Sequence, residues 1–278
     1  MNPMEQRNGN PVLQKVAFVR GDGRSPSEIR HISARLGVFG QADGSAYLQQ
    51  GLTKVLATVY GPHQPRGKSA GNMLKAVKGI VNCQYSTAVF SFGAGVRKKR
   101  PRGDRKSQER EQQLRHAMEA IINLELFAKS QIDIFIEVLQ VDGSEFCVAV
   151  NAATLALIDA GIPIKDYAIA CSITVADDVT EKDEEGAQDG GSLIDANWVE
   201  ECSPGFTLSI VSLPKVVDET QTQSSLILAH GAGRRLHLSR LEALRQRALD
   251  ACKDIRDILD AVVRNHLHTH AAIQSVEK

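Results

Sequence analysis

A strip of concentrated positive charge is the part of the sequence with the clearest chemical potential. Between Arg97 and Arg115, nine residues are Lys or Arg and three are acidic. The strip runs into apolar residues at helical spacing, namely Leu114, Ala117, Met118, Ile121 and Ile122. Its lower part is therefore predicted to be an amphipathic helix with one buried face.

This helix is predicted to begin near Asp104. Pro101 and Gly103 interrupt the chain before it, and the Asp104 carboxylate can accept hydrogen bonds from free backbone N–H groups of the first turn. Arg105 and Lys106 would then stand beside a helix N-terminus, where backbone donors, the helix dipole and fixed charge favour a phosphate group. The alternative interpretation is a solvated basic loop, since basic clusters are common on protein surfaces.

The composition is that of an ordinary globular protein. The chain has 278 residues, 42% of them hydrophobic and 24% charged, with 33 basic and 33 acidic residues. Since these charges cancel, a nucleic-acid partner must be met locally and not by the whole surface. The five cysteines show no CxxC spacing, which indicates reduced thiols and neither a disulfide framework nor a zinc site. We expect no metal or cofactor, and no membrane association, because no apolar run is long enough to span a bilayer.

Turn signals and hydrophobic periodicity divide the chain into an arm, two halves and a tail. Residues 1–19 are predicted to be a loose N-terminal arm. The first half, residues 20–163, opens with a flexible polar lead, RGDGR, and continues as a strand meander that Pro62 ends. It closes with a strand over residues 131–141, in which apolar residues alternate cleanly, and a helix over about residues 144–160.

The second half, residues 164–268, repeats this alternation more briefly and is followed by a tail, residues 269–278. Strands are predicted at 168–175, 192–198, 207–213 and 225–229. Residues 177–191 carry seven acids and one Lys, and a solvated insertion without function is favoured there over a binding site. Such alternation of strands and helices indicates an α+β or α/β domain.

The last helix is predicted to start with a capping box of Ser239 and Glu242. Its buried seam is expected to comprise Leu241, Leu244, Ala248, Ala251, Ile255, Ile258 and Val262. His266, His268 and His270 follow at alternate positions on an end that is expected to fray, which argues against a metal site there.

Five ordered motifs carry a resemblance to a known family. They are ADGSAYLQQGLTKVLATVYGPH (42–63), NCQYSTAVFSFG (82–93), GDRKS (103–107), IDIFIEVLQVDG (132–143) and NAATLALIDAGIP (151–163), with RGDGR before them. Over about residues 20–265 the chain resembles the ribonuclease PH family, and within it the RNA exosome core subunits that correspond to the catalytic chain of the archaeal exosome. The resemblance implies an α+β ribonuclease PH fold (ribosomal protein S5 domain 2-like), with two related βαβ-containing halves and mixed sheets packed against helices.

The resemblance also implies partners and a location. Members assemble with other ribonuclease PH-like subunits into a hexameric ring around a pore for single-stranded RNA, and RNA-binding cap proteins join the ring. They cleave RNA from the 3′ end with phosphate as nucleophile, or they have lost that activity and a separate exosome nuclease degrades the RNA. For this chain the resemblance implies processing of rRNA and other RNAs, and RNA decay, in the nucleus, nucleolus and cytoplasm.

The phosphate site of active members is altered in this sequence. Phosphorolysis requires several donors around an inorganic phosphate, and acidic groups that place a metal or protonate the leaving oxygen. In active members one donor is the Arg that closes a D-x-G-T-R motif, and the same place here reads DGSEF, residues 142–146. Phe146 replaces the Arg, and Glu145 before it would repel phosphate. The loss of one charged donor typically costs a few kcal/mol of transition-state stabilisation.

The acid pair of active members is incomplete as well. Counting on from Asp195 in the family's L-D-L-type strand, the first acid falls at Glu201 and the second at Thr207. No Asp occurs between Asp195 and Asp218, so a small shift in the alignment cannot restore the pair. A threonine is neither a general acid at neutral pH nor a good ligand for a hard cation.

The RNA-binding residues of the family have better matches. Arg105 and Lys106 match a basic pair that touches the RNA backbone. Lys68 and Ser69 match a contact in the loop at the pore mouth. Tyr85 matches an aromatic residue that can stack on a base, although it lies in an apolar strand, so a position in the core is its alternative. Because aromatic residues make up only 5% of the chain, the grip on RNA is expected to be mainly electrostatic.

The sequence thus predicts a catalytically silent, RNA-binding ring subunit with no catalytic residues and no metal. Two rival interpretations remain. One is an active phosphate-dependent 3′–5′ exoribonuclease, because part of the phosphate-binding surface is present. The other is a self-assembled hexamer that processes tRNA ends, as bacterial relatives do.

Overall fold

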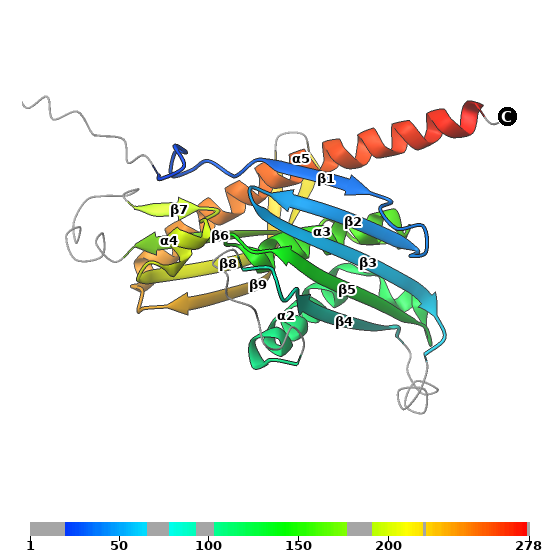
Figure 1. Ribbon diagram of the computed structural model, residues 1–278, viewed down its shortest axis with the longest axis horizontal. Helices are drawn as coiled ribbons and strands as arrows, with labels where there is room; N and C mark the ends of the chain where they lie inside the picture. Colours follow the sequence, from blue (N-terminus) through cyan, green and yellow to red (C-terminus); the bar gives the residue numbers. More distant parts are fainter. Residues whose placement is uncertain (1–19, 66–77, 93–102, 177–190, 219–220, 277–278) are drawn as a thin grey trace, which may run out of the picture.

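The computed structural model describes residues 20–65, 78–92, 103–176, 191–218 and 221–276 (Figure 1). Lys68, Ser69 and the basic strip before Gly103 lie outside these ranges, as do the predicted N-terminal arm and the acidic loop up to residue 190. No described helix is both long and apolar enough to cross a membrane.

A five-stranded mixed sheet forms the first half. Its strands are β1 (Ile32–Leu36), β2 (Gly44–Gln50), β3 (Thr53–His63), β4 (Ile80–Thr87) and β5 (Gln131–Gln140), in the spatial order β1-β2-β3-β5-β4. β4 and β5 pair in parallel and are connected through helix α2 (Arg105–Ile121), whereas the other pairs are antiparallel. Alternate residues of β5, from Ile132 to Val138, are buried in the core, which confirms the alternation in the sequence.

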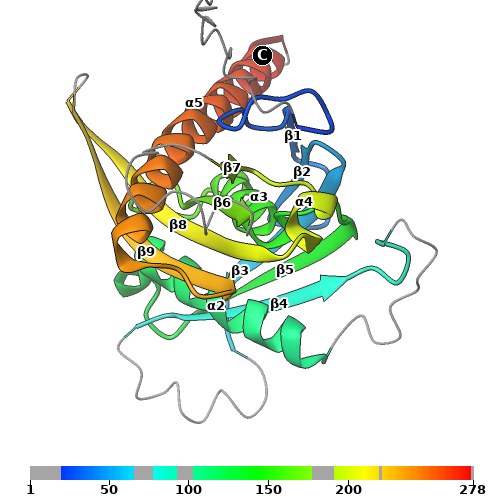
Figure 2. The same cartoon turned by 90° about the vertical axis from the view of Figure 1, so that its left-hand side faces the viewer.

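A four-stranded antiparallel sheet forms the second half. It consists of β6 (Ile169–Ala176), β7 (Ser192–Ile194), β8 (Gly205–Asp218) and β9 (Gln221–Gly233), in the order β7-β6-β8-β9. The far ends of β8 and β9 project from the body as a long hairpin (Figure 2). Within the described residues, the parallel βαβ unit is therefore confined to the first half.

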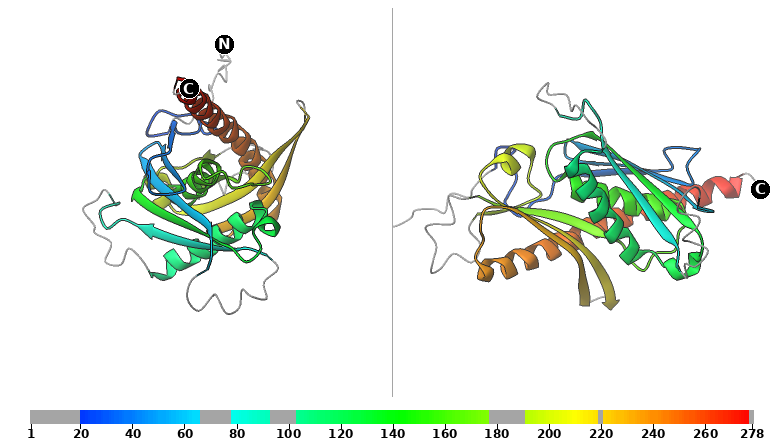
Figure 3. Two further views of the ribbon diagram at one scale, coloured as in Figure 1. Left: turned by 90° about the vertical axis from the view of Figure 1, so that its right-hand side faces the viewer. Right: turned by 90° about the horizontal axis from the view of Figure 1, so that it is seen from below.

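Helix α3 (Glu145–Asp159) lies between the two sheets (Figure 3). Thirteen of its fifteen residues are buried, which explains why it is apolar on all sides and not on one stripe. Helix α5 (Leu238–Val276) packs along β6 and β8 and reaches past β1. The two halves share one hydrophobic core as a result, and the division predicted at residue 163 remains a prediction.

The segment RGDGR is ordered, contrary to the prediction of a flexible lead. The side chain of Arg20 is fully buried, and its guanidinium donates to the Ile194 carbonyl over 2.7 Å and pairs with the Glu200 carboxylate. A buried guanidinium persists only where such partners satisfy it. These partners stand 174 and 180 positions further along the chain, so local sequence gave no sign of them.

Pro62 does not end β3, which continues to His63. The prediction failed because of the antiparallel partner strand β2. This strand begins at Gly44, which is paired with Val59, so the residues of β3 beyond Val59 have no partner strand on that side. A proline, which lacks an N–H donor, is tolerated at such an edge position.

The strand predicted over residues 192–198 is also wrong in its second part. Only Ser192–Ile194 form a strand, and the short helix α4 (Trp198–Cys202) follows. Asn197 caps this helix by accepting from the Glu200 N–H over 2.9 Å, while the Glu200 carboxylate accepts from the Asn197 N–H over the same distance. The capping box overlaps the end of the strand predicted over residues 192–198, so the sequence pattern did not predict it.

The capping box predicted for the last helix is wrong, because α5 begins at Leu238 and Ser239 is already its second residue. The buried seam continues as predicted to Ile255, but it then passes to Leu259 and Val263, while Ile258 is 39% exposed. Both continuations fit helical spacing, and the position of the packed sheets decides between them.

The end of the chain differs from the predicted fraying tail, since α5 remains helical to Val276. His266 Nε2 lies 3.4 Å from the Asp159 carboxylate, at the end of α3. The same carboxylate accepts from the backbone N–H groups of Gly37 and Ser45. These contacts tie the last turns of α5 to the first sheet.

A buried ion pair between Arg30 and Asp195 joins the two halves. Arg30 Nη2 donates to Asp195 Oδ1 over 2.7 Å, and Arg30 Nε donates to Oδ2 over 3.0 Å, with both side chains at least 95% buried. Burial alone would raise the pKa of Asp195, but the hydrogen bonds and charge of Arg30 lower it below its ordinary value. The carboxylate is therefore charged in the folded protein.

We predict that Asp195→Asn lowers the free energy of unfolding by about 3 to 5 kcal/mol at neutral pH, because the Arg30 charge stays buried without its partner. The depressed pKa stabilises the fold fully above the ordinary aspartate pKa of about 3.9, and this contribution is lost as the pH falls through the folded value. As the pH is lowered from 5 through the folded pKa of Asp195, the free energy of unfolding should therefore fall less for the variant than for the parent.

Urea unfolding at several pH values measures both effects. Asp22→Asn is the matched control, since Asp22 pairs with Arg24 at the surface, and it should change stability by less than about 1 kcal/mol. A loss that is no larger for Asp195→Asn than for Asp22→Asn would contradict the importance of the buried pair.

Candidate functional site

A cavity of about 470 Å³ opens between α2, the connection from α4 to β8, and β9. Its lining carries charges of both signs. The charged and titratable residues in it are Lys106, Glu109, Arg110, Glu201, His230 and Arg234. The cavity is thus built from three segments that are far apart in the sequence. It contains Lys106, which is predicted to bind RNA, and Glu201 and Thr207, which stand at the positions of the family's acid pair.

Helix α2 supplies the positive charge of the cavity. It begins at Arg105 with Asp104 at the N-cap, as predicted, but the Asp104 carboxylate makes no capping hydrogen bond, and only its backbone carbonyl accepts from Gln108. Lys106 and Arg110 stand four residues apart and therefore share one face of the helix. Arg105 is exposed outside the lining of the cavity, and it forms no ion pair with a described residue.

Glu145, the first residue of α3, offsets the positive charge of Lys106 and Arg110 from the buried side of α2. Its carboxylate lies 3.4 Å from Lys106 Nζ and 3.8 Å from Arg110 Nη2, and its side chain is only 10% exposed. The Arg110 guanidinium also lies 5.1 Å from the centre of the Phe146 ring, in a cation–π contact. Two of the three cations that line the cavity, Lys106 and Arg110, therefore already interact with other side chains of the chain itself.

The N-terminus of α3 is occupied by a second carboxylate. Gly143 and Ser144 turn the chain into α3 with φ values of 79° and 53°, and the Ser144 N–H donates to Glu201 Oε2 over 3.2 Å. Gly143 is required here, because a Cβ atom would stand 2.4 Å from the Ala196 carbonyl oxygen. Free N–H groups at a helix start favour an anion, and Glu201 provides one.

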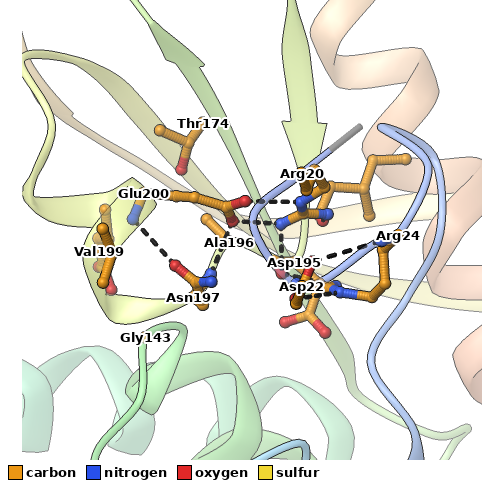
Figure 4. A network of polar contacts seen from close by, with 12 residues as sticks. Arg20, Asp22, Arg24, Gly143, Thr174, Asp195, Ala196, Asn197, Val199 and Glu200 are labelled. Carbon is orange, nitrogen blue, oxygen red and sulfur yellow. Dashed lines mark hydrogen bonds and ion pairs between the residues drawn. The ribbon is translucent and has the colours of Figure 1, made fainter. Parts of the chain in front are cut away.

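The polar network in Figure 4 fixes the helix that carries Glu201. Arg20 Nε donates to Glu200 Oε1 over 2.7 Å, beside the capping box of α4. Burial would raise the pKa of Glu200, but the Arg20 hydrogen bond lowers it. On the other side, Arg30 Nη2 donates to the Gly143 carbonyl over 3.3 Å. Glu201 and the turn that it contacts are thus both held by buried arginines.

Thr207 lies on β8 and lines the same cavity. Its hydroxyl oxygen is 3.4 Å from that of Thr174 on the neighbouring strand β6. A hydroxyl held in this way supplies neither the charge nor the proton that the second acid of active family members would supply. Phe146 lies below the cavity and is 1% exposed, so it offers no hydrogen-bond donor to a ligand.

The structure places Lys106, Glu201 and Thr207 in the lining of one cavity, with Phe146 close to Arg110. The sequence motifs did not predict that Lys106 lies beside the two acid-pair positions. Arg110, His230 and Arg234 are among the lining residues that were not predicted. Arg110 could have been found from its spacing to Lys106, whereas His230 on β9 and Arg234, directly after β9, had no signal in the local sequence. His230 Nδ1 lies 3.2 Å from Gln113 Nε2 on α2.

Tyr85 requires a correction. Its side chain faces the core below α2 and is 3% exposed, so no face of the ring is open to a base. Burial, followed by the charge of Glu145, raises the pKa of Tyr85 well above its ordinary value. The strand β4 alternates buried and half-buried residues, and this alternation places Tyr85 on the same face as Val81 and Cys83. The core interpretation is therefore the one that the structure supports.

No group of three or more His, Cys, Asp or Glu residues close enough to hold a metal ion occurs within the described part of the chain. Cys83, Cys147, Cys171 and Cys252 are free and buried, and Cys202 is free and exposed. Burial raises the pKa of Cys83, Cys147 and Cys252 to about 12, which keeps these thiols protonated and unreactive.

Comparison with known proteins identifies the family. The family described as 3′ exoribonuclease family, domain 1 (RNase PH), matches residues 28–163. The chain is 46% identical to the exosome complex component RRP41 of Homo sapiens over 248 residues, which cover 89% of this chain and 91% of that protein. The chain belongs to the ribonuclease PH family. It is also 32% identical to the exosome complex component Rrp41 of Cenarchaeum symbiosum (strain A), over 92% of this chain and 94% of that protein.

Solved structures of the ribonuclease PH family share the fold. Rrp46 of rice (Oryza sativa) superimposes with a TM-score of 0.69 at 24% identity, over 88% of this chain and 100% of that chain. The exosome of Archaeoglobus fulgidus with RNA bound to the active site matches with a TM-score of 0.64 at 18% identity. The match covers 86% of this chain and 92% of that chain. These likenesses confirm the predicted α+β ribonuclease PH fold.

The burial of Tyr85 leads to a stability prediction. Its hydroxyl group is buried and has no hydrogen-bond partner among the described residues, so it costs desolvation without a compensating bond. Tyr85→Phe should leave the free energy of unfolding unchanged or raise it by up to about 1 kcal/mol, as measured by urea unfolding. Tyr167→Phe is the comparison, since the Tyr167 hydroxyl donates to Asp260 and its removal should destabilise. Destabilisation by Tyr85→Phe would show that the hydroxyl is satisfied in solution.

Proposed function

We propose that this chain is a non-catalytic, RNA-binding subunit of the RNA exosome core. The names of its relatives as exosome components support the assembly. The observation that carries the loss of catalysis is the occupation of the anion-binding position by the chain's own carboxylates, Glu145 and Glu201. In this proposal the chain lines the pore of a hexameric ring, RNA-binding cap proteins join the ring, and RNA passes to a separate 3′–5′ nuclease.

Electrostatics explain why these carboxylates exclude phosphate. Inorganic phosphate near neutral pH carries one to two negative charges, as phosphate groups do, and it would have to enter beside two ionised carboxylates in a partly buried site. Like charges at such distances repel strongly where water is excluded. Two of the three cations that line the cavity, Lys106 and Arg110, already interact with Glu145. Phe146 adds no hydrogen-bond donor, and Thr207 adds no acid.

We predict that the parent chain, assembled with its ring partners, binds inorganic phosphate weakly and releases no nucleoside diphosphates from single-stranded RNA with magnesium and phosphate. Replacing both carboxylates, in Glu145→Gln with Glu201→Gln, should tighten phosphate binding by at least about tenfold, because each removed charge contributes of the order of 1 kcal/mol or more at this range. Isothermal titration calorimetry with inorganic phosphate measures the binding, and thin-layer chromatography of labelled RNA measures the cleavage.

Glu109→Gln is the matched control, because Glu109 lines the same cavity but contacts neither Lys106 nor the N-terminus of α3 in the described structure. It should change phosphate binding less than the double variant does, because it leaves Glu145 and Glu201 in place. Diphosphate release by the parent that disappears in Arg110→Ala would overturn the non-catalytic proposal. Unchanged phosphate binding by the double variant would contradict the proposal that Glu145 and Glu201 exclude phosphate. It would not affect the conclusion drawn from the cleavage assay.

The RNA contact is proposed for the exposed start of α2. Arg105 is exposed and without an ion pair among the described residues, and Lys106 Nζ stands on a side chain that is 66% exposed. These positions suit attraction to a phosphate backbone without reading of bases. Lys68 and Ser69, which lie outside the described residues, stay proposed RNA contacts. The location proposed for the assembly is the nucleus, nucleolus and cytoplasm, where it would process rRNA and other RNAs.

We predict that Arg105→Glu with Lys106→Glu weakens RNA binding by the assembled ring by at least about tenfold at low salt, and by less at high salt, because the contact is screened. Filter binding and RNase protection at two ionic strengths measure the effect, with gel filtration to verify assembly. Lys253→Glu with Arg264→Glu makes the same charge change on α5 and should not reduce binding. Equal binding by both double variants would mean that the start of α2 is only a solvated surface.

An active phosphorolytic exoribonuclease is the second candidate. The observation in its favour is that Lys106, Arg110 and Glu201 line one cavity in a ribonuclease PH fold. The phosphorolysis assay described above separates the two candidates directly. The purification of the chain with other ribonuclease PH-like proteins would further distinguish a mixed ring from a ring made of this chain alone.

A further inference from the structure

The outer face of the five-stranded sheet combines apolar and acidic side chains in register. Val55, Ala57 and Val59 of β3 are fully buried on the core side, so the alternate residues point to the other face. Across the pair of β3 and β5, Leu56 stands opposite Glu137, Thr58 opposite Phe135, and Tyr60 opposite Asp133. Carboxylate and aromatic side chains therefore alternate along β5, opposite Leu56, Thr58 and Tyr60 of β3.

A continuous groove follows this row. Three cavities of about 280, 390 and 570 Å³ adjoin on this face, and all three are lined by Tyr60. Phe39, from the connection between β1 and β2, lines the first two, and Phe135 lines the second. We call these cavities together the aromatic groove. Helices α2 and α3 pack against the opposite, core side of the sheet (Figures 1 and 3).

The aromatic groove exposes large apolar side chains on a rigid support. Phe39 is 44% exposed and Tyr60 is 38% exposed. The Tyr60 and Phe135 rings meet edge to face, with centroids 5.7 Å apart and planes at 76°, which fixes both rings before any ligand binds. Exposed aromatic side chains that are held in place and gathered in one groove are typical of protein-binding surfaces.

The charge of the aromatic groove selects among possible ligands. Asp43, Asp133 and Glu137 line it, whereas no Lys or Arg of the described chain does so. Asp133 accepts from Asn82 and lies 3.3 Å from His63, but Glu137 forms no ion pair with any described residue. This lining repels the phosphates of RNA, and it attracts a Lys or Arg, whose charge can also contact the faces of the aromatic rings.

From these observations we infer that the aromatic groove binds an extended segment of another protein that combines aliphatic and basic side chains. Aliphatic residues would pack on Phe39, Leu56 and Tyr60, and a Lys or Arg would reach Glu137. This inference does not rest on the proposed RNA-binding role or on the loss of catalysis, since the groove lies on the far side of the sheet from α2 and α3. It assigns the basic and the acidic surfaces of the chain to different partners.

The test uses the full chain in the complex in which it purifies, and a fluorescently labelled short peptide of alternating leucine and lysine as probe. A peptide of alternating leucine and glutamate and a labelled uridine RNA serve as comparison ligands. Fluorescence anisotropy measures the affinity of each for the parent, for Phe39→Ala with Glu137→Gln, and for the matched control Phe90→Ala with Glu125→Gln. Phe90 and Glu125 are highly exposed and lie outside the groove.

The basic peptide should bind the parent, and the groove variant should weaken this binding at least about tenfold, while the control variant binds like the parent. Hydrogen exchange on the parent with and without peptide gives an independent readout, and protection should appear in β3 and β5. Equal weakening by the control variant, absence of peptide binding, or protection of β3 and β5 by the RNA or the acidic peptide would each overturn the inference.

Discussion

The buried pair of Arg30 and Asp195 is the interaction on which the site depends. It joins the two sheets across the core, and the Arg30 guanidinium donates onward to the Gly143 carbonyl. Taking both charges out of water is costly unless every donor and acceptor is satisfied, so the pair tolerates only one arrangement of the turn before α3. That turn presents the Ser144 N–H, and the neighbouring segment after Asp195 continues into α4 with Glu201.

The same framework that could hold a phosphate holds carboxylates instead. A helix start with free N–H groups, two cations four residues apart on α2, and a cavity above them are features that suit an anion. In this chain Glu201 takes the place at the helix start and Glu145 takes the cations. Arg20 and Arg30 fix the elements that carry these acids, so the proposed loss of the phosphate site rests on these buried contacts as much as on the single replacement at Phe146.

Although the net charge of the chain is zero, the molecule has one basic surface and one acidic surface. The start of α2 exposes Arg105 and Lys106, and the aromatic groove on the other face of the first sheet is lined by acids without Lys or Arg in the described residues. Attraction between exposed charges acts mainly within a Debye length, so the proposed RNA contact and the proposed basic protein segment would bind to different faces. For a chain proposed to work inside an assembly, this separation allows simultaneous contact with both kinds of partner.

Local pattern was sufficient to predict the α+β class, the strand β5, the start of α2 and the family, because alternation, helical spacing and long motifs are written in contiguous residues. It also matched Glu201 and Thr207 to one pair of positions in the active site of the family. It could not predict that Arg20 is buried, that Tyr85 belongs to the core, that Asn197 caps a helix, or that Arg234 and His230 line the cavity. Apart from the cap at Asn197, whose partner Glu200 is three residues away, each of these depends on partners brought from distant parts of the chain. Only the packing of two sheets around α3 decides which side chains lose water, and therefore which charges must find a partner and which remain free to bind.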